Sequence, residues 1–539
     1  MLSFSFASGL VALLLLPPLA IILKGLYNIF LHPLANKVPG PFWARFSGLP
    51  SWYYAYRGDR HLWLHRQFKA YGYRVRIEPN TVLFCHPQAY DAIYSMKANV
   101  RRGRFYEALK RDVNDTSTLT CIDVAAHAKK RRCLNLCFTE RSILAACRFV
   151  IAHVDRWIDI ITSEDIQDAD EWSQPLNFSD KVDALIFDIT SDLSFGKSFN
   201  IKEPEDNPFK DIPHNIAEWL KFHYLISRVP FLDLLLWLKP RGLDRLFGFI
   251  APPSAKHYDQ FVQDSVTSRI AVYREQDKEP EEEGRQDLFH FLAEARDPKT
   301  GTVAYDENEL RAESNLLLIA GSDTSSISLS GIFFYLTGNQ LKLNKLMEEI
   351  RTTFQSLDDI VYGQRLRSCT YLRACIDEGM RLTPPGPSEL PREVLSGGIE
   401  IKGEFYPAGT IVGTTNWANS RNPEVYEDPD VFRPERWIVD EATGVTKESV
   451  ARAKAAFHPF SSGPASCIGQ NLAMAEIQIT IARTLYQLDV RRAPGSTLGG
   501  GSPELGWGRT DPNQYQLVDA YISLREGPEV QFRRRGFGA

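Results

Sequence analysis

The sequence has 539 residues, is 44% hydrophobic and 12% aromatic, and carries a formal net charge of −5. This slightly acidic balance excludes nucleic acid as the main partner, because phosphate binding requires a basic surface. Eight cysteines in a chain of this length exclude a disulfide framework. No internal repeat or long linker divides the chain beyond about residue 50, so we expect one large catalytic domain over residues 51–539.

An uncharged apolar segment opens the chain. Residues 1–23 contain no charged side chain, and Lys24 follows directly. The segment is long enough to cross a bilayer as a helix, which Pro17 and Pro18 would kink. A cleaved signal peptide is the alternative, but the segment lacks a basic start and its apolar run is longer than such peptides have. We therefore expect a retained transmembrane anchor, and the cations that follow it place the rest of the chain in the cytosol.

Residues 24–50 form the expected connector. The run HPLANKVPGP (32–41) contains three prolines, which restrict φ and remove N–H donors. We expect a stiff, extended segment here. Short alternating runs such as YRVRIEPNTVLF (73–84) then predict strands.

Most of the remaining chain has helical periodicity, so the predicted fold class is mainly α with a minor β portion. The helical runs include AHAKKRRCLNLCF, LNKLMEEIRTTF, YLRACIDEGMRL and the segment after Cys467. Cys133 and Cys137 are four residues apart, as metal ligands can be. They lie in a helical pattern without a second Cys or His pair at zinc-like spacing, so we expect ordinary buried thiols.

The longest predicted helix starts at Asp306 and stops at Gly338. Asp306 and Glu309 form a capping-box pattern, and the middle of the segment is apolar on nearly all sides. Its sequence AGSDTSS (320–326) places an acid and several hydroxyls in a helix that we expect to be buried. Two interpretations stay open. The hydroxyls bond back to i−4 carbonyls while Asp323 reaches a surface, or the helix widens at Gly321 and these groups hold water and pass protons.

Two further motifs carry charge. EGMR places Glu378 and Arg381 three residues apart on one helix, where such pairs commonly lie at the surface. FRPERW (432–437) supplies Arg436 from a loop-like stretch. A Glu–Arg–Arg cluster would lock that loop onto the helix, provided that every buried charge is paired.

The loop FSSGPASCIG (460–469) presents one cysteine immediately before a predicted helix. The helix dipole and free N–H groups favour the thiolate form of Cys467. A thiolate in this position acts as a nucleophile or as a metal ligand. The sequence shows no obvious catalytic histidine for a nucleophile, whereas axial ligation of haem iron requires only this loop and a helix on the opposite side.

The ordered set AGSDTS, EGMR, FRPERW and FSSGPASCIG resembles the cytochrome P450 family, with the family's spacing, across essentially the whole chain. The anchor and connector are similar to those of the microsomal class, and LHPLANKVPGP is similar to fungal members. The resemblance implies a triangular, mainly helical prism around haem b. It also implies reduction by NADPH through a cytochrome P450 reductase, use of O₂, and a single-pass location in the endoplasmic reticulum membrane.

The resemblance also implies residue roles. Cys467 would be the proximal iron ligand, in a loop whose Phe460, Gly463 and Gly469 lie against the cofactor. Thr324 would hold the distal water, with Asp323 in the proton relay. Glu378, Arg381 and Arg436 match the structural triad. His127, Arg131 and Arg392 match residues that reach the haem propionates, and Lys129, Lys130 and Arg132 either face the reductase or form a solvated charge run.

One position departs from the family pattern. Ala465 stands where the family commonly has an arginine that pairs with a propionate. Such a charge-assisted contact contributes roughly 1.5–3 kcal/mol. The compensating residues available by resemblance are His127, Arg131 and Arg392.

The implied function is insertion of one oxygen atom from O₂ into a hydrophobic molecule, by hydroxylation or epoxidation. Two alternatives are a haem-thiolate isomerase or dehydratase, which needs no proton relay, and an inactive haem carrier. Resemblance to fungal members indicates a step in secondary metabolism on a terpenoid, polyketide or alkaloid; hydroxylation of a simple aromatic acid is the runner-up. The substrate pocket is expected to draw on residues 103–126, Leu317–Ala320 and 384–390, without nucleic acid as a partner.

Overall fold

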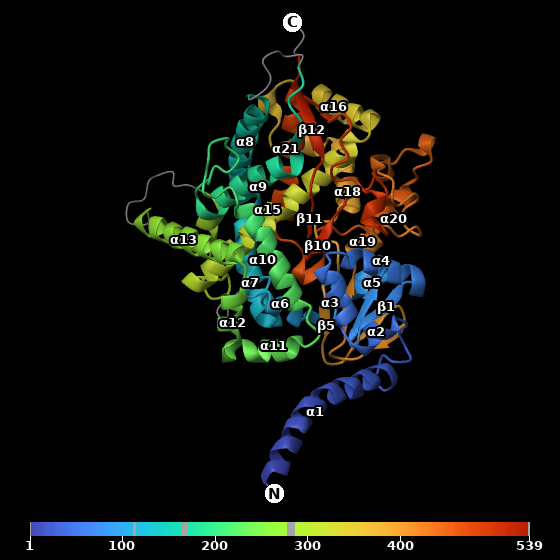
Figure 1. Cartoon of the computed structure of the whole chain (residues 1–539). Helices are drawn as coiled ribbons and strands as arrows, with labels where there is room; N and C mark the ends of the chain where they lie inside the picture. The colour runs from blue at the N-terminus through green and yellow to red at the C-terminus, as the bar shows by residue number, and fades with distance from the viewer. Residues whose placement is uncertain (1, 112–114, 164–170, 277–285, 537–539) are drawn as a thin grey trace.

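One long helix, α15 (Glu307–Thr337), crosses the centre of the molecule in a computed structural model that describes residues 2–111, 115–163, 171–276 and 286–536 (Figure 1). Its 31 residues span about 46 Å at 1.5 Å per residue. Asp306 accepts a hydrogen bond from the Glu309 amide, the Glu309 side chain closes the capping box, and Gly338 follows the last turn. The predicted helix and both of its boundaries are confirmed.

Helices on several sides bury α15. They share one hydrophobic core that includes Leu185, Phe333 and Ile477. The surrounding helices are α8 (Glu140–Ser163), α9 (Phe178–Phe195), α16 (Gln340–Thr353), α18 (Thr370–Leu382) and α21 (Gln470–Gln487). A second core joins α9 and α15 to α10 (Ile212–Ser227) and α13 (Pro253–Gln276).

The main β-sheet lies beside the N-terminal helices and has the order β1-β2-β8-β5-β3 (Figure 1). Only the β2–β8 pair is parallel; the other three pairs are antiparallel. The predicted strand region 73–84 forms the first two of these strands, which Pro79 and Asn80 connect. The strands are β1 (Arg74–Glu78), β2 (Thr81–Phe84), β3 (Val100–Arg102), β5 (Arg392–Val394) and β8 (Ile411–Thr414).

The other strands form small sheets near the C-terminus and at the edge of the main sheet. These are β4 (Leu176–Asn177), β12 (Glu529–Arg534) and β9 (Leu488–Arg492) in one sheet, β10 (Val518–Ala520) with β11 (Ile522–Leu524), and β6 (Ile399–Ile401) with β7 (Glu404–Tyr406). The remaining helices are α2 (Phe42–Phe46), α3 (Leu49–Tyr56), α4 (Arg60–Tyr71), α5 (Pro87–Tyr94), α6 (Arg104–Ala108), α7 (Val124–Asn135), α11 (Leu232–Leu238), α12 (Leu243–Ile250), α14 (Leu288–Glu294), α17 (Gln364–Arg367), α19 (Asn416–Asn419) and α20 (Lys447–Ala455). The arrangement is mainly α with a minor β portion, as the sequence predicts.

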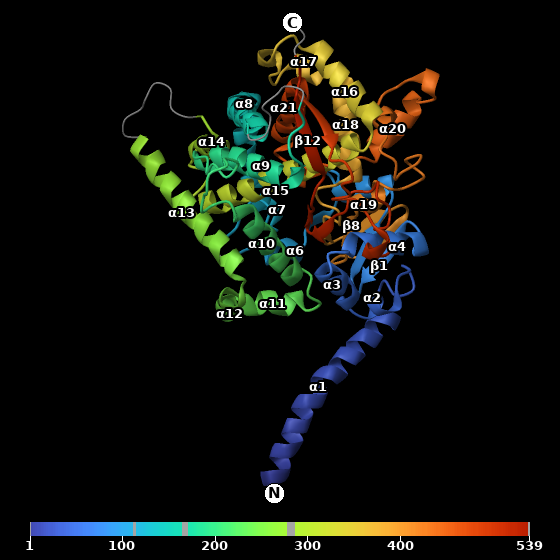
Figure 2. The same ribbon diagram turned by 45° about the horizontal axis from the view of Figure 1, so that its top comes forward.

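The N-terminal helix α1 (Leu2–Phe30) projects away from the body of the molecule (Figures 1 and 2). Side chains are described only from Leu15 onward, so most of the predicted anchor over residues 1–23 lies outside the described side chains. Leu15–Phe30 is apolar. Among the helices searched in the described part of the chain, only α15 is long and apolar enough to cross a membrane, and its burial makes it a core helix.

The connector differs from the extended segment that the prolines predict. The helix α1 continues to Phe30, and residues 31–38 form turns closed by hydrogen bonds from the Ala35 amide to the His32 carbonyl and from the Val38 amide to the Leu34 carbonyl. Leu34 and Val38 are buried against the main sheet. Burial of these apolar side chains favours a compact turn over the extended form that proline alone prefers.

Candidate active site

The loop that carries Cys467 is folded tightly. The Cys467 amide donates to the Phe460 carbonyl at 2.7 Å, which closes the loop, and α21 begins at Gln470. Gly463 has φ +68°, and a Cβ at this position would overlap the carbonyl oxygen of Tyr94 on α5. Glycine is therefore required at position 463. Gly469 has a negative φ, and its role is to bring a backbone N–H to the sulfur.

The Cys467 side chain is exposed, yet the surrounding protein raises its pKa by burial. The thiol is therefore accessible, while the protein packed around it still disfavours its charged form. Backbone N–H groups of Gly469 and Gln470 and the Arg131 guanidinium act in the opposite direction but do not outweigh burial. The amide groups at the helix start thus favour the thiolate, as the sequence predicts, but burial outweighs them and raises the pKa of Cys467. A bound metal cation would supply the missing stabilisation, because coordinating thiols are deprotonated.

Four basic side chains gather beside this loop. Arg131 on α7 donates to the Ser466 carbonyl at 2.5 Å, one residue from Cys467. The pKa of His127 falls to about 3, because burial and the neighbouring charges of Arg102, Arg131 and Arg392 all disfavour its cation. The three arginines and His127 thus form one basic cluster.

The basic cluster fits an anionic group. Buried nitrogen atoms of two of its members, Nε of Arg102 and Nε2 of His127, have no hydrogen-bond partner among the described residues. The charged groups that shift the pKa values of these two residues include no carboxylate. Buried cations without a counter-charge are costly, so the cluster is suited to the carboxylates of a haem beside Cys467.

The middle of α15 contains an exposed position between buried neighbours. Ala320 is exposed, while Leu318 and Ser322 are buried. The Thr324 hydroxyl donates to the Ala320 carbonyl at 2.7 Å, and Ser322 and Ser328 make equivalent bonds to their i−4 carbonyls. The helix is continuous here, so the structure shows hydroxyl back-bonding and no widening at Gly321.

Asp323 does not reach the surface, which was one of the two interpretations of its motif. Its Oδ2 atom is buried and has no hydrogen-bond partner in the described part of the chain. Burial and the nearby Asp183 carboxylate raise the pKa of Asp323 to about 7, and Arg525 opposes this shift. Arg525 itself pairs with Asp183 of α9. The structure therefore puts a carboxyl that can exchange a proton near neutral pH next to Thr324.

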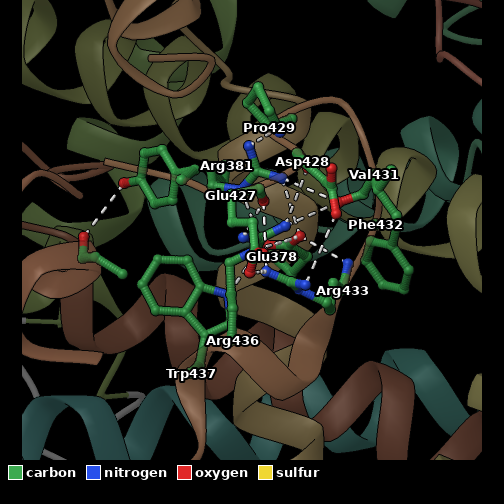
Figure 3. A network of polar contacts seen from close by, with 12 residues as sticks. Glu378, Arg381, Glu427, Asp428, Pro429, Val431, Phe432, Arg433, Arg436 and Trp437 are labelled. Atoms are coloured by element: carbon green, nitrogen blue, oxygen red, sulfur yellow. Dashed lines mark hydrogen bonds and ion pairs between the residues drawn. The ribbon is translucent and has the colours of Figure 1, made fainter. Parts of the chain in front are cut away.

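Glu378, Arg381 and Arg436 meet in one buried network (Figure 3). Arg381 binds both carboxylate oxygens of Glu378 at 2.9 Å, and Arg436 Nε lies 2.9 Å from Glu378 Oε1. The indole N–H of Trp437 also donates to Glu378, at 3.0 Å. Burial alone would raise the pKa of Glu378, but the two arginines outweigh it and hold the pKa below its usual value.

This network joins α18 to the loop before the Cys467 segment. Arg381 also donates to the carbonyl oxygens of Ser420 and Pro429, at 2.5 and 2.6 Å. Trp437 is the last residue of the FRPERW motif, and nothing in that pattern predicts its bond to Glu378. Its contribution depends on the 3₁₀ turn at Pro434–Trp437, which folds the indole back toward Glu378.

The charge run on α7 divides between surface and core. Lys129 is exposed, whereas Lys130 is buried and pairs with Glu309 on α15 at 2.8 Å. Lys130 is therefore not available to a reductase, because its side chain binds the two helices together. Cys133 and Cys137 of the same helical region are buried and free, as predicted.

The segments predicted to line the substrate pocket differ in what their side chains do. Phe105 and Tyr106 of α6 pack near Tyr521, which no sequence motif indicates. Tyr521 has φ +75° at the turn between β10 and β11. In residues 384–390, the Glu389 carboxylate instead binds Arg60 and Arg228 in a buried ion cluster. Residues 112–114 of the predicted segment 103–126 lie outside the described residues.

Similarity to known proteins identifies the family of this chain. The chain matches the family model described as Cytochrome P450 over residues 38–499. It is 34% identical to the cytochrome P450 monooxygenase fscF of Fusarium equiseti, across 100% of this chain and 99% of that protein. It is also 34% identical to the cytochrome P450 monooxygenase apf7 of Gibberella fujikuroi, across 95% of this chain and 96% of that protein. The chain therefore belongs to the cytochrome P450 family of oxidoreductases.

Proposed function

We propose that this protein is a haem-thiolate monooxygenase that inserts one oxygen atom from O₂ into a hydrophobic small molecule in secondary metabolism. The observation that carries the proposal is the exposed Cys467 thiol beside a basic cluster without a counter-charge. The named fungal relatives are monooxygenases, which supports the same reaction class.

Cys467 would hold the iron of haem b, and the basic cluster would hold its carboxylates. When bound, the haem supplies O₂ activation by electrons that arrive from NADPH through a reductase. Exposed Lys129 near the α7 surface is available for an acidic partner of that kind. The Glu378 network would keep the Cys467 side of the fold rigid.

Thr324 and Asp323 would move protons at the distal side. The Thr324 hydroxyl donates its proton to Ala320 and keeps its lone pairs free to accept a hydrogen bond from water. Asp323 exchanges protons near neutral pH because burial raises its pKa to about 7. This arrangement favours O₂ chemistry over a haem-thiolate isomerase, which requires no proton relay.

The substrate would lie over Ala320, whose methyl side chain leaves space in the middle of α15. Phe105, Tyr106 and Tyr521 form an aromatic group, and Tyr521 packs against the same hydrophobic core as Ile319, the neighbour of Ala320. Aromatic rings bury large areas and suit a hydrophobic or aromatic molecule. This supports a terpenoid, polyketide or alkaloid substrate, with a simple aromatic acid as the other candidate class.

One end of the molecule supports a membrane location. The apolar part of α1 leaves the body on the side where α11 and α12 lie (Figures 1 and 2). None of the eight residues of α12 is buried, and Phe249 is 80% exposed. Exposed apolar patches of this kind contact lipid or protein. We place the protein on the endoplasmic reticulum membrane, anchored by α1, with the catalytic domain in the cytosol.

The experiment that tests the haem-thiolate assignment is the absorption spectrum of the reduced carbon-monoxide complex. The purified protein should show the red-shifted Soret band of a thiolate ligand, and Cys467→Ala should abolish it. Cys369→Ala, at a free cysteine that is buried elsewhere in the fold, should keep the band. A band that survives in Cys467→Ala would place the ligand elsewhere.

The reaction class needs a separate measurement. With purified NADPH-dependent reductase, the protein should consume NADPH and O₂ together when a substrate is present. A haem-thiolate protein that transforms an organic peroxide without NADPH would instead be an isomerase or dehydratase.

A further inference from the structure

A buried ion cluster joins three distant parts of the chain. Glu389 accepts hydrogen bonds from Arg60 at the start of α4 and from Arg228, which directly follows α10. All three side chains are buried. Burial alone would raise the pKa of Glu389, but Arg228 and Arg60 outweigh it and lower the pKa to about 2. Glu389 is therefore ionised at neutral pH.

The two arginines of this cluster differ in how completely they are paired. Arg60 binds Glu389 through both terminal nitrogen atoms, and its Nε donates to the Ser51 hydroxyl at 2.9 Å. Arg228 binds Glu389 through Nη1 alone, at 2.6 Å. The Nε and Nη2 atoms of Arg228 are buried and have no hydrogen-bond partner in the described part of the chain. Buried donors without an acceptor are costly, so a ligand that supplies one would be favoured here.

The two unpaired atoms of Arg228 have a defined geometry. Nε and Nη2 lie on the same edge of the planar guanidinium group, and their N–H bonds on that edge are nearly parallel. This edge matches the two oxygen atoms of a carboxylate, which it binds with two parallel hydrogen bonds. A single carbonyl oxygen would share both donors at poorer angles. The free edge of Arg228 is therefore suited to a carboxylate.

The charges of the cluster also favour an anion. Arg60 and Arg228 carry two positive charges, and Glu389 supplies one negative charge. The carboxylates of Glu78 and Asp519 act on both arginines only through space, since neither forms an ion pair with them among the residues that the structure describes. Burial raises the pKa of Asp519 and so opposes its charge. A further carboxylate would balance the second arginine, as buried charges require.

Arg228 adjoins the aromatic group of the proposed substrate site. Its guanidinium carbon lies 4.4 Å from the centre of the Phe105 ring and 5.3 Å from that of Tyr224. Phe105 in turn packs against Tyr106 and Tyr521, with ring centres 5.2 and 5.3 Å away. Phe105 therefore links the arginine to the rings on which a hydrophobic substrate would pack.

We propose that Arg228 is a specificity-determining residue that binds the carboxylate of the substrate, and that the substrate is a hydrophobic carboxylic acid. The inference rests on the proposed function and narrows its substrate class. Polyketide, terpenoid and aromatic acids carry the required group, whereas the amine of a basic alkaloid would meet a like charge. Glu389 holds Nη1 of Arg228 and leaves the opposite edge for the substrate.

The test compares the affinity of the purified holoprotein for hydrophobic acids with its affinity for their methyl esters. The probes are the saturated acids from octanoic to hexadecanoic acid and 4-phenylbenzoic acid, each with its ester, and isothermal titration calorimetry at neutral pH measures binding. At least one acid should bind about 10- to 100-fold more tightly than its ester, because hydrogen bonds between charged groups are strong. The proposal is overturned if no acid binds, or if every ester binds as tightly as its acid.

Arg228→Gln should weaken binding of that acid by about 10- to 100-fold and leave the affinity for its ester unchanged. The difference between the two probes is the readout, because a general loss of packing would weaken both. Arg241→Gln is the matched control. Arg241, between α11 and α12, also stacks on an aromatic ring, that of Trp237 at 4.2 Å, but it is exposed and lies outside the ion cluster. Its substitution should change neither affinity.

Arg228→Lys keeps the test decisive if thermal unfolding shows that the glutamine variant is misfolded. Lysine retains the charge that faces Glu389 but cannot form two parallel bonds, so binding of the acid should weaken by about 3- to 10-fold with no change for the ester. Wild-type affinity for the acid in a folded Arg228→Gln variant, or in Arg228→Lys where the first is misfolded, would overturn the role of Arg228.

The outcomes separate this proposal from the proposed function. A wild-type protein without haem would refute the proposed function. A haem-containing protein that binds the esters as tightly as the acids would refute the carboxylate site alone.

Discussion

At the scale of single residues, Asp323, the acid beside Thr324, has the largest consequence for the chemistry of the site. Asp323 is buried, lacks a partner at Oδ2 and has a pKa of about 7. A surface aspartate would stay ionised at neutral pH and could not take up and release protons there. Its environment, rather than its identity, gives Asp323 this property.

Asp323→Asn should change the pH dependence of stability. A carboxyl whose pKa is higher in the folded chain than in the unfolded chain stabilises the fold at low pH, and this contribution is lost as pH rises through the folded value. For Asp323 the window runs from its ordinary value of 3.8 to about 7. The free energy of unfolding at pH 8 should therefore rise in Asp323→Asn, and its slope between about pH 4 and 7 should become flatter, as measured by denaturant titration. A slope equal to that of the wild type would mean that the carboxyl is ionised in the fold.

Thr324→Ala should uncouple electron use from oxygenation. Haem should stay bound, but product formed per NADPH should fall by about tenfold or more, with hydrogen peroxide released instead, because positioned proton transfer contributes about 10²–10⁴-fold. The assay uses the hydrophobic compound that gives the largest substrate-induced spectral shift. Ser322→Ala is the control, since Ser322 makes the same back-bond on a buried face of α15. Equal coupling in both variants would assign Thr324 a packing role.

At the scale of elements, the crossing of α15 and α18 holds the two sides of the site together. Gly331 on α15 and Gly379 on α18 allow this crossing: a Cβ at Gly331 would lie 2.6 Å from the Thr383 Cβ, and one at Gly379 would overlap Ile332. The Glu378 network then ties α18 to the loop before Cys467. Helix α18 is therefore held in place both by its close packing against α15 and by the ion pairs of Glu378.

Gly331→Ala should lower the free energy of unfolding by about 1–3 kcal/mol, the cost of overpacking a core. Gly248→Ala is the control, because Gly248 lies in the exposed helix α12 and a Cβ there meets no atom within 4 Å. That substitution should be neutral or stabilise by up to about 1 kcal/mol, through helix propensity. Chemical denaturation of both variants gives the comparison. Equal effects would show that the crossing has room for a methyl group.

At the scale of the whole molecule, the described side chains of α1 bind the domain near the C-terminal end of the helix. Asn28 donates to the Phe46 carbonyl at 3.1 Å, and Arg76 donates to the Asn28 carbonyl at 2.9 Å. Gly25 packs against the Phe46 ring. The first turns project away from the body instead (Figure 2).

Deletion of residues 2–23 should therefore release the protein from membranes without unfolding it. The contacts of Gly25 and Asn28 remain in that variant, so thermal unfolding should match that of the full chain. Deletion of residues 2–31 removes them and leaves Arg76 Nη2 without its Asn28 acceptor, so it should unfold at a lower temperature. Flotation with phospholipid vesicles measures the first effect. A shorter chain that floats like the full chain would mean that α11 and α12 are sufficient for binding.

The sequence alone determined the family, the fold class and the long helix from its capping box to Gly338, because these depend on local spacing and periodicity. The order and spacing of the motifs along the chain also indicated that Glu378, Arg381 and Arg436 belong together. Only the tertiary structure decided which charges are buried and what faces them. It put Lys130 in a helix–helix contact, gave Cys467 a raised pKa, folded the connector into turns and paired Glu389 with Arg60 and Arg228. The reason is physical: periodicity is a property of neighbours along the chain, whereas desolvation and charge pairing depend on residues that lie far apart in sequence and meet only in the folded protein.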